Sequence, residues 1–271
     1  MSVGKWLGSI CICMLLPYWA QLVVADDDEE ETAEEEQMEL LLAPPPIPWG
    51  YTGQTGPNHW ASISESYSLC GTGKHQSPVD IADTKLSYLP PLNFQYHTSV
   101  LTISREGGSL WVDYDSGSYL NIRGKRYRFI GFDFHTPGEH TFNGDRSEME
   151  IHLHHLDSQG RRLIVAIPVV GGHRSNITLT RISENVPNHD TLMQYRRIGI
   201  NPMFLLPADR SYALYSGSET KPPCEEDVLW IVFMNPLRVS NQEINYLHSI
   251  VGDNARPVQP LNNRVILQSN L

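Results

Sequence analysis

The sequence has no second long apolar segment after its first 25 residues and no hydrophobic tail at its C-terminus. We therefore expect neither a polytopic membrane protein nor a lipid-anchored one. Basic residues are scarce, with 20 Lys and Arg against 31 Asp and Glu in 271 residues, a formal net charge of −11. Such a chain repels phosphate backbones, which argues against nucleic acid as a partner. The sequence has no internal repeat, and its composition excludes collagen-like and low-complexity chains.

Residues 1–25 have the features of a secretory signal peptide. Lys5 gives the start of the segment a positive charge, and an apolar stretch follows over residues 6–24. Ala25 supplies a small residue at a cleavage site. The alternative is an uncleaved signal anchor, although Pro17 weakens this stretch as a bilayer helix. We therefore expect a secreted, extracellular protein.

Residues 26–43 form an acidic arm that we expect to be disordered. Nine of the eleven residues over 26–36 are acidic, which gives too much self-repulsion and too little apolar surface for independent folding. The arm is either a solvated spacer or a loose binding segment for divalent cations or basic partners, because dense carboxylates suit hard cations. Prolines then mark the start of a domain over 44–271, in which 21 acids and 19 bases nearly balance.

The use of cysteine agrees with export. Two of the four cysteines lie in the signal segment, so the mature chain keeps Cys70 and Cys224. An even number in an oxidising compartment favours a disulfide, and two buried free thiols are the alternative. In a secreted chain, the sequon that begins at Asn176 is a candidate glycosylation site.

Short apolar or alternating runs separated by turn residues dominate the domain, as is typical of strands. The runs are 101–103, 110–114, 127–135, 150–156, 163–170 and 228–234. Only residues 242–250 have the pattern of a helix of any length. We therefore predict a mostly β fold with minor helices, built on one large sheet.

Two of these runs contain ionisable residues where a buried strand should have none. Alternation puts Asp133 and His135 on one face of their strand. In the next run, Glu150, His152 and His154 share a face. If the strands are neighbours, Asp133, His135 and His152, with His154 as a further candidate, can converge on one metal ion such as zinc, and Glu150 can orient a histidine. Histidines on strands are also often structural, so the spacing leaves both interpretations open.

Seven short motifs occur in order along the chain. They are Gly56–Trp60, Gly73–Ile81, Phe134–His140, Asn143–Gly144, Glu150–His155, Gly217–Cys224 and Asn254–Leu261. In sequence and order they resemble the α-class carbonic anhydrases. The resemblance implies a single domain with a large central, mainly antiparallel twisted sheet of ten strands, a metal at the bottom of a conical cleft, and a Cys70–Cys224 disulfide.

The resemblance implies the family's active site in this sequence, with one metal ligand changed. Members of the family hold zinc with three histidines, of which His135 and His152 match two, whereas Asp133 stands at the first position. The other catalytic positions match those of active members. They are Glu150, which orients His152, Thr220, which orients the zinc-bound hydroxide, and Glu139, which accepts the threonine proton.

The aspartate changes the charge of the predicted metal site. Three neutral imidazoles leave zinc dipositive, which lowers the pKa of its bound water toward neutrality. Asp133 removes one unit of charge and is shorter than histidine, so we expect weak zinc binding and a less acidic water. An Asp-His-His set also accepts manganese or iron, which leaves the identity of the metal open.

The neighbouring substrate pocket and the proton exit are changed as well. His154, Val165, Glu219 and Trp230 match the apolar wall against which carbon dioxide sits in the family, and two of the four are ionisable. Because an unpaired buried carboxylate is costly, we expect a His154–Glu219 pair. Gly108 stands where active members carry a shuttle histidine, and glycine cannot relay protons.

These changes lead to three hypotheses of function. The first is a secreted carbonic anhydrase-related protein with CO2 hydration lost or strongly reduced, and with a binding or extracellular matrix role toward an unknown partner. The second is a working zinc enzyme that converts CO2 and water to bicarbonate and a proton through Asp133, His135 and His152. The third is a calcium- or mineral-interacting protein that acts through the acidic arm.

Overall fold

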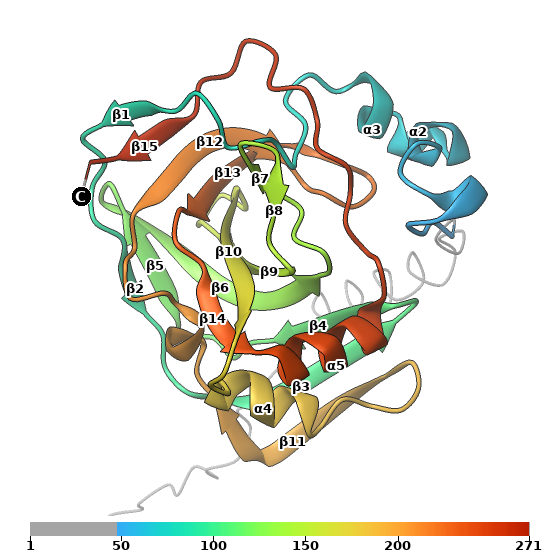
Figure 1. Ribbon diagram of the computed structural model, residues 1–271, viewed down its shortest axis with the longest axis vertical. Coiled ribbons are helices and arrows are strands. Elements are labelled where there is room, and N and C mark those ends of the chain that lie inside the picture. The colour runs from blue at the N-terminus through green and yellow to red at the C-terminus, as the bar shows by residue number, and fades with distance from the viewer. Residues whose placement is uncertain (1–47, 271) are drawn as a thin grey trace, which may run out of the picture. The chain divides into compact units, whose positions relative to one another are not determined.

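A twisted sheet of 13 strands forms the centre of the domain (Figure 1). The computed structural model describes residues 48–270, so the predicted signal segment and acidic arm lie outside the described residues. Ten strands follow one path in the order β1-β15-β12-β13-β10-β9-β6-β4-β3-β11, and β2, β5 and β14 pair alongside it. Strand β10 is parallel to β13 and β14, β1 is parallel to β15, and the other neighbours are antiparallel. The predicted mostly β fold on one large twisted sheet is confirmed.

The strands vary widely in length. They are β1 Lys85–Ser87, β2 Asn93–Gln95, β3 Ser99–Glu106, β4 Ser109–Asp113, β5 Tyr119–Ile122, β6 Lys125–His135, β7 Thr141–Phe142, β8 Asp145–Arg146, β9 Met149–Leu156, β10 Arg162–Gly172, β11 Thr191–Ile200, β12 Tyr212–Ser218, β13 Glu226–Phe233, β14 Leu237–Ser240 and β15 Leu267–Ser269. All six predicted runs fall on these strands. Strand β11 was not predicted because it is an edge strand whose side chains are mostly exposed, so it lacks the apolar alternation of a half-buried strand.

The helices are short and few in the described residues. They are η1 Gly53–Thr55, α2 Trp60–Ile63, η2 Glu65–Tyr67, α3 Leu69–Thr72, α4 Ile177–Ser183, η3 Pro202–Leu205 and α5 Asn241–Val251. Helix α5 contains the predicted helical segment and begins with a capping box between Ser240 and Glu243. None of the helices in residues 48–270 is long and apolar enough to cross a membrane.

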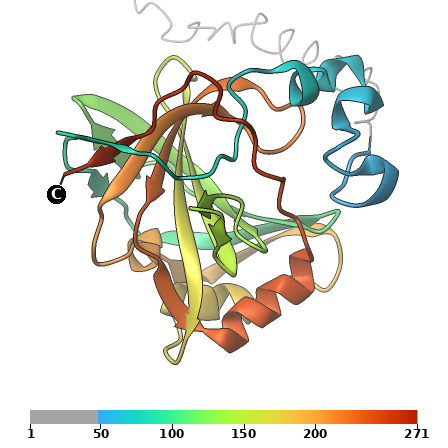
Figure 2. The same cartoon turned by 45° about the horizontal axis from the view of Figure 1, so that its top comes forward.

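The N-terminal helical segment is attached to the sheet by a disulfide. The short helices up to α3 lie at one side of the sheet, apart from α5 (Figure 2). There Trp60 packs in a small apolar cluster with Cys70 and Cys224. The two cysteines are bonded, so the predicted pairing is confirmed, and it joins positions 154 residues apart.

The sequon residue Asn176 is part of a helix cap. Its side-chain oxygen accepts hydrogen bonds from the backbone of Thr178 and Leu179, which begins α4. Its amide group donates to the backbone oxygen of Phe204 at 2.7 Å. Glycosylation at this position stays a prediction.

Candidate metal centre

The predicted site lies where β6 and β9 run side by side at the centre of the sheet. The antiparallel register places Asp133 opposite His152 and His135 opposite Glu150. The same register places Gly131 opposite His154, and a β-bulge shifts the pairing between Phe129 and Gly131. Because alternate residues of a strand share a face, the acidic and histidine side chains from both strands lie on the same face of the sheet.

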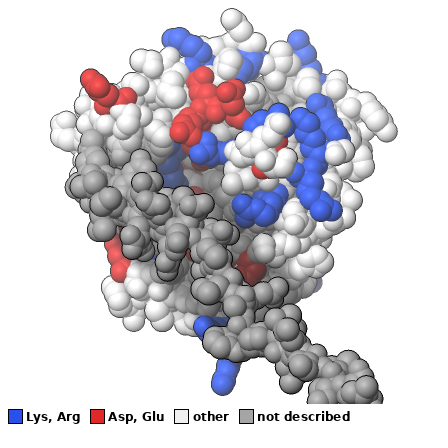
Figure 3. Space-filling model, turned by 180° about the vertical axis from the view of Figure 1, so that it is seen from behind, with Lys and Arg blue, Asp and Glu red and all other residues white. Residues whose placement is uncertain are grey.

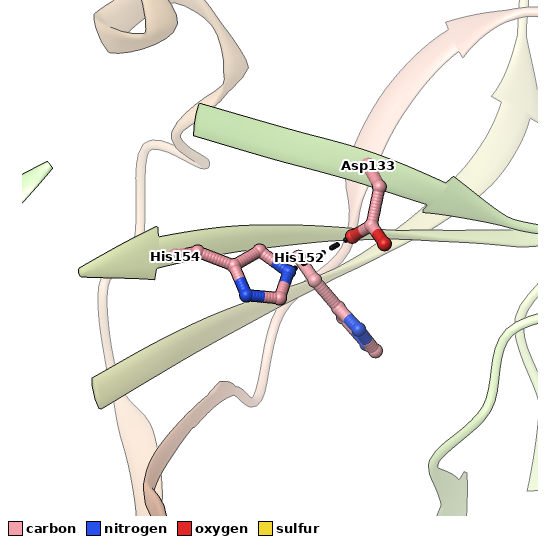
Figure 4. A group of neighbouring side chains, drawn as sticks. All are labelled: Asp133, His152 and His154. Carbon is pink, nitrogen blue, oxygen red and sulfur yellow. Dashed lines mark hydrogen bonds and ion pairs between the residues drawn. The ribbon is translucent and has the colours of Figure 1, made fainter. Parts of the chain in front are cut away.

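Asp133 is buried and tightly paired. Its carboxylate forms an ion pair with the ammonium group of Lys221, and the Nε2–H of His154 donates to its Oδ1 at 3.0 Å. Figure 4 shows His154 turned toward Asp133, whereas His152 makes no bond to it. Burial alone would raise the pKa of Asp133, but Lys221 and His154 hold it well below its usual range.

His135 has one nitrogen engaged and one free. Its Nδ1–H donates to the backbone oxygen of Asn254 at 3.0 Å. Its Nε2 is buried and has no hydrogen-bond partner among residues 48–270, and it lies 3.5 Å from Oδ2 of Asp133. Burial lowers the pKa of His135, but the carboxylates of Glu139 and Asp133 raise it to about 9. A metal ion at Nε2 would therefore have to displace a proton.

His152 is oriented by a buried carboxylate. Its Nε2–H donates to Oε1 of Glu150 at 2.6 Å, which leaves the lone pair on Nδ1. The same Oε1 accepts from Nδ1–H of His140 at 2.7 Å, and Nε2 of His140 lies 2.7 Å from the hydroxyl of Tyr215. Burial favours the neutral acid, yet the two histidines lower the pKa of Glu150 far below its usual value.

The histidines fit a zinc ion better than the aspartate does. The imidazoles of His135 and His152, with ring centroids 4.4 Å apart, are suitable donors for zinc once His135 has lost its proton. The compact groups of three potential ligands among the described residues include His135 with Glu139 and His152, and Asp133 with His152 and His154. The predicted set of Asp133, His135 and His152 is not one of these groups, and both oxygens of Asp133 already have other partners.

Thr220 and Glu139 lie near the site, and no hydrogen bond between them is present among the described residues. Glu139 accepts a hydrogen bond from the backbone N–H of Arg256 at 2.8 Å through Oε1. Its Oε2 is buried and unpaired in the part of the chain that the structure describes. No hydrogen bond joins it to Thr220 in residues 48–270, so the catalytic role of this pair stays a prediction.

Comparison with known proteins identifies the fold around this site. A family model described as eukaryotic-type carbonic anhydrase matches residues 55–270. A carbonic anhydrase from Nostoc sp. is 36% identical over 229 residues, which are 82% of this chain and 86% of that protein. The chain is a member of the α-carbonic anhydrase family. Carbon dioxide and bicarbonate are the substrates of this family, which uses zinc.

Solved structures agree with this assignment. A hyperthermostable carbonic anhydrase from an active hydrothermal vent chimney matches with a TM-score of 0.79 and 35% identity, over 82% of this chain and 100% of that one. Dioscorin complexed with ascorbate matches with a TM-score of 0.75 and 26% identity, over 82% and 97% of the two chains.

In this α-carbonic anhydrase domain, the cleft is polar and carries charges of both signs. A cavity of about 320 Å3 is lined by Trp111, Asp133, His152, His154, Arg162, Glu219, Thr220, Lys221, Pro222 and Pro223. Glu219 lies 3.2 Å from the guanidinium of Arg162. The expected His154–Glu219 pair is therefore wrong, because His154 bonds to Asp133 and Glu219 forms an ion pair with Arg162.

The two apolar positions of the predicted pocket are fully buried. Val165 and Trp230 are both inaccessible to solvent, and the indole N–H of Trp230 donates to the backbone oxygen of Ser218 at 2.9 Å. Gly108, at the predicted shuttle position, lies in the turn between β3 and β4 with φ +80°, a conformation that favours glycine.

Sequence reasoning did not assign Trp111, Arg162 or Lys221 to the cleft. Lys221 neutralises Asp133, and the acid at a buried position was itself the signal to look for a cation. Trp111 lies against Gly131, where a Cβ atom would be 2.4 Å from the indole Cζ2. A glycine two residues before Asp133 was the signal that a large side chain from the next strand fills this space.

Proposed function

We propose that this α-carbonic anhydrase domain has lost most or all of its CO2 hydration activity and serves as a secreted binding protein. The ion pair between Asp133 and Lys221 is the observation that carries this proposal. It puts a permanent cation beside a carboxylate at the position of the first zinc ligand. The partner in this role is an extracellular molecule or matrix component.

The ion pair opposes metal binding in two ways. A zinc ion that used Asp133 would have to displace Lys221 from a nearly buried carboxylate, and it would then lie close to a like charge. Of the predicted set, His135 and His152 then remain, and a third ligand would have to come from Glu139, the carboxylate grouped with them. A zinc ion held there would supply a Lewis acid, but we expect weak binding.

The cleft also disfavours carbon dioxide. This substrate has no net charge or dipole, whereas the cavity presents Lys221, Arg162, Glu219 and His154. Polar groups that lose water to an apolar guest must be compensated by other hydrogen bonds. A polar organic molecule fits this lining better, and the ascorbate complex of dioscorin supports a binding role for the fold.

A working zinc enzyme is the second candidate function. The neighbouring imidazoles of His135 and His152, together with Glu150 bonded to His152, favour it. In that case Asp133 would serve as the third ligand after Lys221 has moved away.

A third candidate, calcium or mineral binding through the acidic arm, concerns residues outside the described part of the chain. Deletion of residues 26–39 tests it. Loss of calcium binding supports a function of the arm, and unchanged calcium binding dismisses it.

Stopped-flow CO2 hydration by the purified mature protein, supplied with zinc, separates the first two candidates. We expect a rate equal to that of buffer and a zinc content below one equivalent after dialysis. A rate well above buffer that a zinc-directed inhibitor abolishes would overturn the proposal and establish the enzyme.

Variants test which change in the cleft causes the expected loss of CO2 hydration. We expect the double change Asp133→His with Lys221→Thr to raise zinc retention and hydration above those of the wild-type protein. The matched control is Asp157→His with Arg161→Thr, an acid–base pair outside the cleft, of which Arg161 is exposed, and it should change neither. A folded double variant that retains zinc without hydration would assign the remaining loss to the polar substrate wall.

A further inference from the structure

A second hollow, which we call the cationic groove, shares no lining residue with the cleft. It has a volume of about 450 Å3 and is lined by Tyr119, Lys125, Arg126, Arg128, Leu156, Asp157, Ser158, Gln159 and Arg161. Four of these nine residues are cations and one is an anion. Figure 3 shows Lys and Arg gathered on one side of the face seen from behind.

The sheet places these side chains in a row. In the β5–β6 hairpin, Tyr119 pairs with Arg128 and Asn121 with Arg126. Arg128 in turn stands opposite Leu156 of β9, and Leu156 stands opposite Arg162 of β10. Paired residues on neighbouring strands share a face. The row therefore runs across four strands and ends at Arg162, which also lines the cleft.

Three cations of the groove have no counter-charge. Among residues 48–270, no acidic side chain lies within 4.0 Å of Lys125, Arg126 or Arg128, and all three are exposed. The one acid of the groove, Asp157, is already bonded to Arg161, with Oδ2 at 2.6 Å from Nη2. The groove therefore keeps a local excess of three positive charges on a domain that is otherwise nearly neutral.

The apolar surface of the groove suits a chain of sugars. The guanidinium of Arg126 lies over the ring of Tyr119, 4.5 Å from its centroid, and Leu156 forms part of the floor. An aromatic ring and an aliphatic side chain offer contact to the apolar faces of sugar rings. The guanidinium groups beside them present forked N–H donors that match planar or tetrahedral oxyanions.

We propose that the cationic groove binds a sulfated polysaccharide. Its sulfate groups would pair with Lys125, Arg126 and Arg128, while its sugar rings contact Tyr119 and Leu156. The disulfide of the domain is typical of an oxidising compartment, where such polysaccharides are accessible and nucleic acids are scarce. This inference does not depend on the state of the cleft.

Calorimetric titration of the full mature chain with a heparin octasaccharide tests the proposal at about 0.15 M salt. We expect saturable binding, and a Kd that rises roughly tenfold or more in the triple variant Lys125→Gln, Arg126→Gln, Arg128→Gln, because three charge contacts are lost together. A chemically desulfated octasaccharide should bind the wild-type protein as weakly as the heparin octasaccharide binds the triple variant. Unchanged thermal unfolding of the triple variant shows that its fold is intact.

The control variant is Lys85→Gln, Arg196→Gln, Arg197→Gln, which removes the same charge from exposed positions on β1 and β11, the two ends of the sheet. It should keep the wild-type Kd. Absence of wild-type binding, or an equal loss in both variants, would overturn the proposal. Equal binding of the desulfated chain would overturn sulfate recognition. Single-stranded DNA that binds as tightly and loses affinity in the same variant would identify a general polyanion site instead.

Discussion

At the residue scale, Asp133 combines burial with a full negative charge. Burying an unpaired carboxylate costs several kcal/mol, and the cost is offset only by partners with good geometry. Lys221 and His154 supply such partners here. The pair is therefore expected to tolerate joint replacement far better than the loss of one member.

A double-mutant cycle tests this coupling. Lys221→Met should lower the free energy of unfolding by about 2 kcal/mol, since it leaves Asp133 without its cation in a site that stays partly open to solvent. Asp133→Asn with Lys221→Met should lose at least 1 kcal/mol less than the sum of the single changes, by rough analogy with other coupled pairs. Urea unfolding at neutral pH measures all four proteins. Additive losses would show that the two side chains do not interact.

His155 is a buried histidine on the opposite face from the cleft. Its Nε2 accepts from the hydroxyl of Tyr96 at 2.6 Å, and its Nδ1–H donates to the backbone oxygen of Leu163 at 3.2 Å. Burial lowers the pKa of His155 to about 3. The unfolded chain, with an ordinary histidine pKa of about 6.5, therefore binds a proton that the folded chain excludes.

Stability should consequently fall as the pH decreases below about 6.5, and His155 contributes about 1.4 kcal/mol per pH unit until about pH 3. The variant His155→Gln carries no charge at any pH. We expect its free energy of unfolding to fall less steeply between about pH 6 and pH 4 than that of the wild-type protein. Parallel curves from urea unfolding would contradict this assignment.

At the element scale, β6 and β4 are fitted to each other through Gly131 and Trp111. A Cβ atom at Gly131 would lie 2.4 Å from Cζ2 of Trp111 and 2.6 Å from the backbone oxygen of Val112. The indole N–H of Trp111 donates to Asp113 at 2.7 Å, which holds the ring over the glycine. The bulge next to Gly131 changes the register just before Asp133.

Gly131→Ala should therefore destabilise the domain by about 3 kcal/mol, since both a side chain and a backbone atom must move. Gly160→Ala is the control, because Gly160 also has a positive φ, 75°, but has nothing within 4 Å of an added Cβ. It should cost about 1 kcal/mol. Equal losses in urea unfolding would mean that the contact with Trp111 carries no strain.

At the scale of the whole molecule, one covalent bond ties the N-terminal segment to the strand-rich body. The Cys70–Cys224 bond closes a separation of 154 residues. Loop entropy assigns such a closure about 5 kcal/mol, which is an upper value for the folded protein. Cys224 also precedes β13 and follows the segment with Lys221, so the bond anchors one wall of the cleft.

The variant Cys70→Ala with Cys224→Ala should lose roughly 3–5 kcal/mol of unfolding free energy while keeping its secondary structure. Urea unfolding followed by circular dichroism measures the loss. The wild-type protein under a reducing agent should approach the same value. A change below about 1 kcal/mol would show that packing around Trp60 alone holds the segment.

The fold was largely readable from local patterns. Alternation over 127–135 and 150–156 predicted β6 and β9. A strand that buries one face has apolar residues at every second position, and this pattern is visible in the sequence. The motifs identified the family, and an even cysteine count suggested the disulfide. Strand β11 was not predicted because its residues are mostly exposed and show no apolar alternation.

The sequence by itself determined which ionisable side chains face the cleft, since alternation along β6 and β9 follows from backbone geometry. It did not determine how those charges pair. Lys221 is 88 residues from Asp133, and Arg162 is 57 residues before Glu219. Only the tertiary structure decides which of several cations reaches each carboxylate, because electrostatic energy depends on distance and burial in space rather than on separation along the chain.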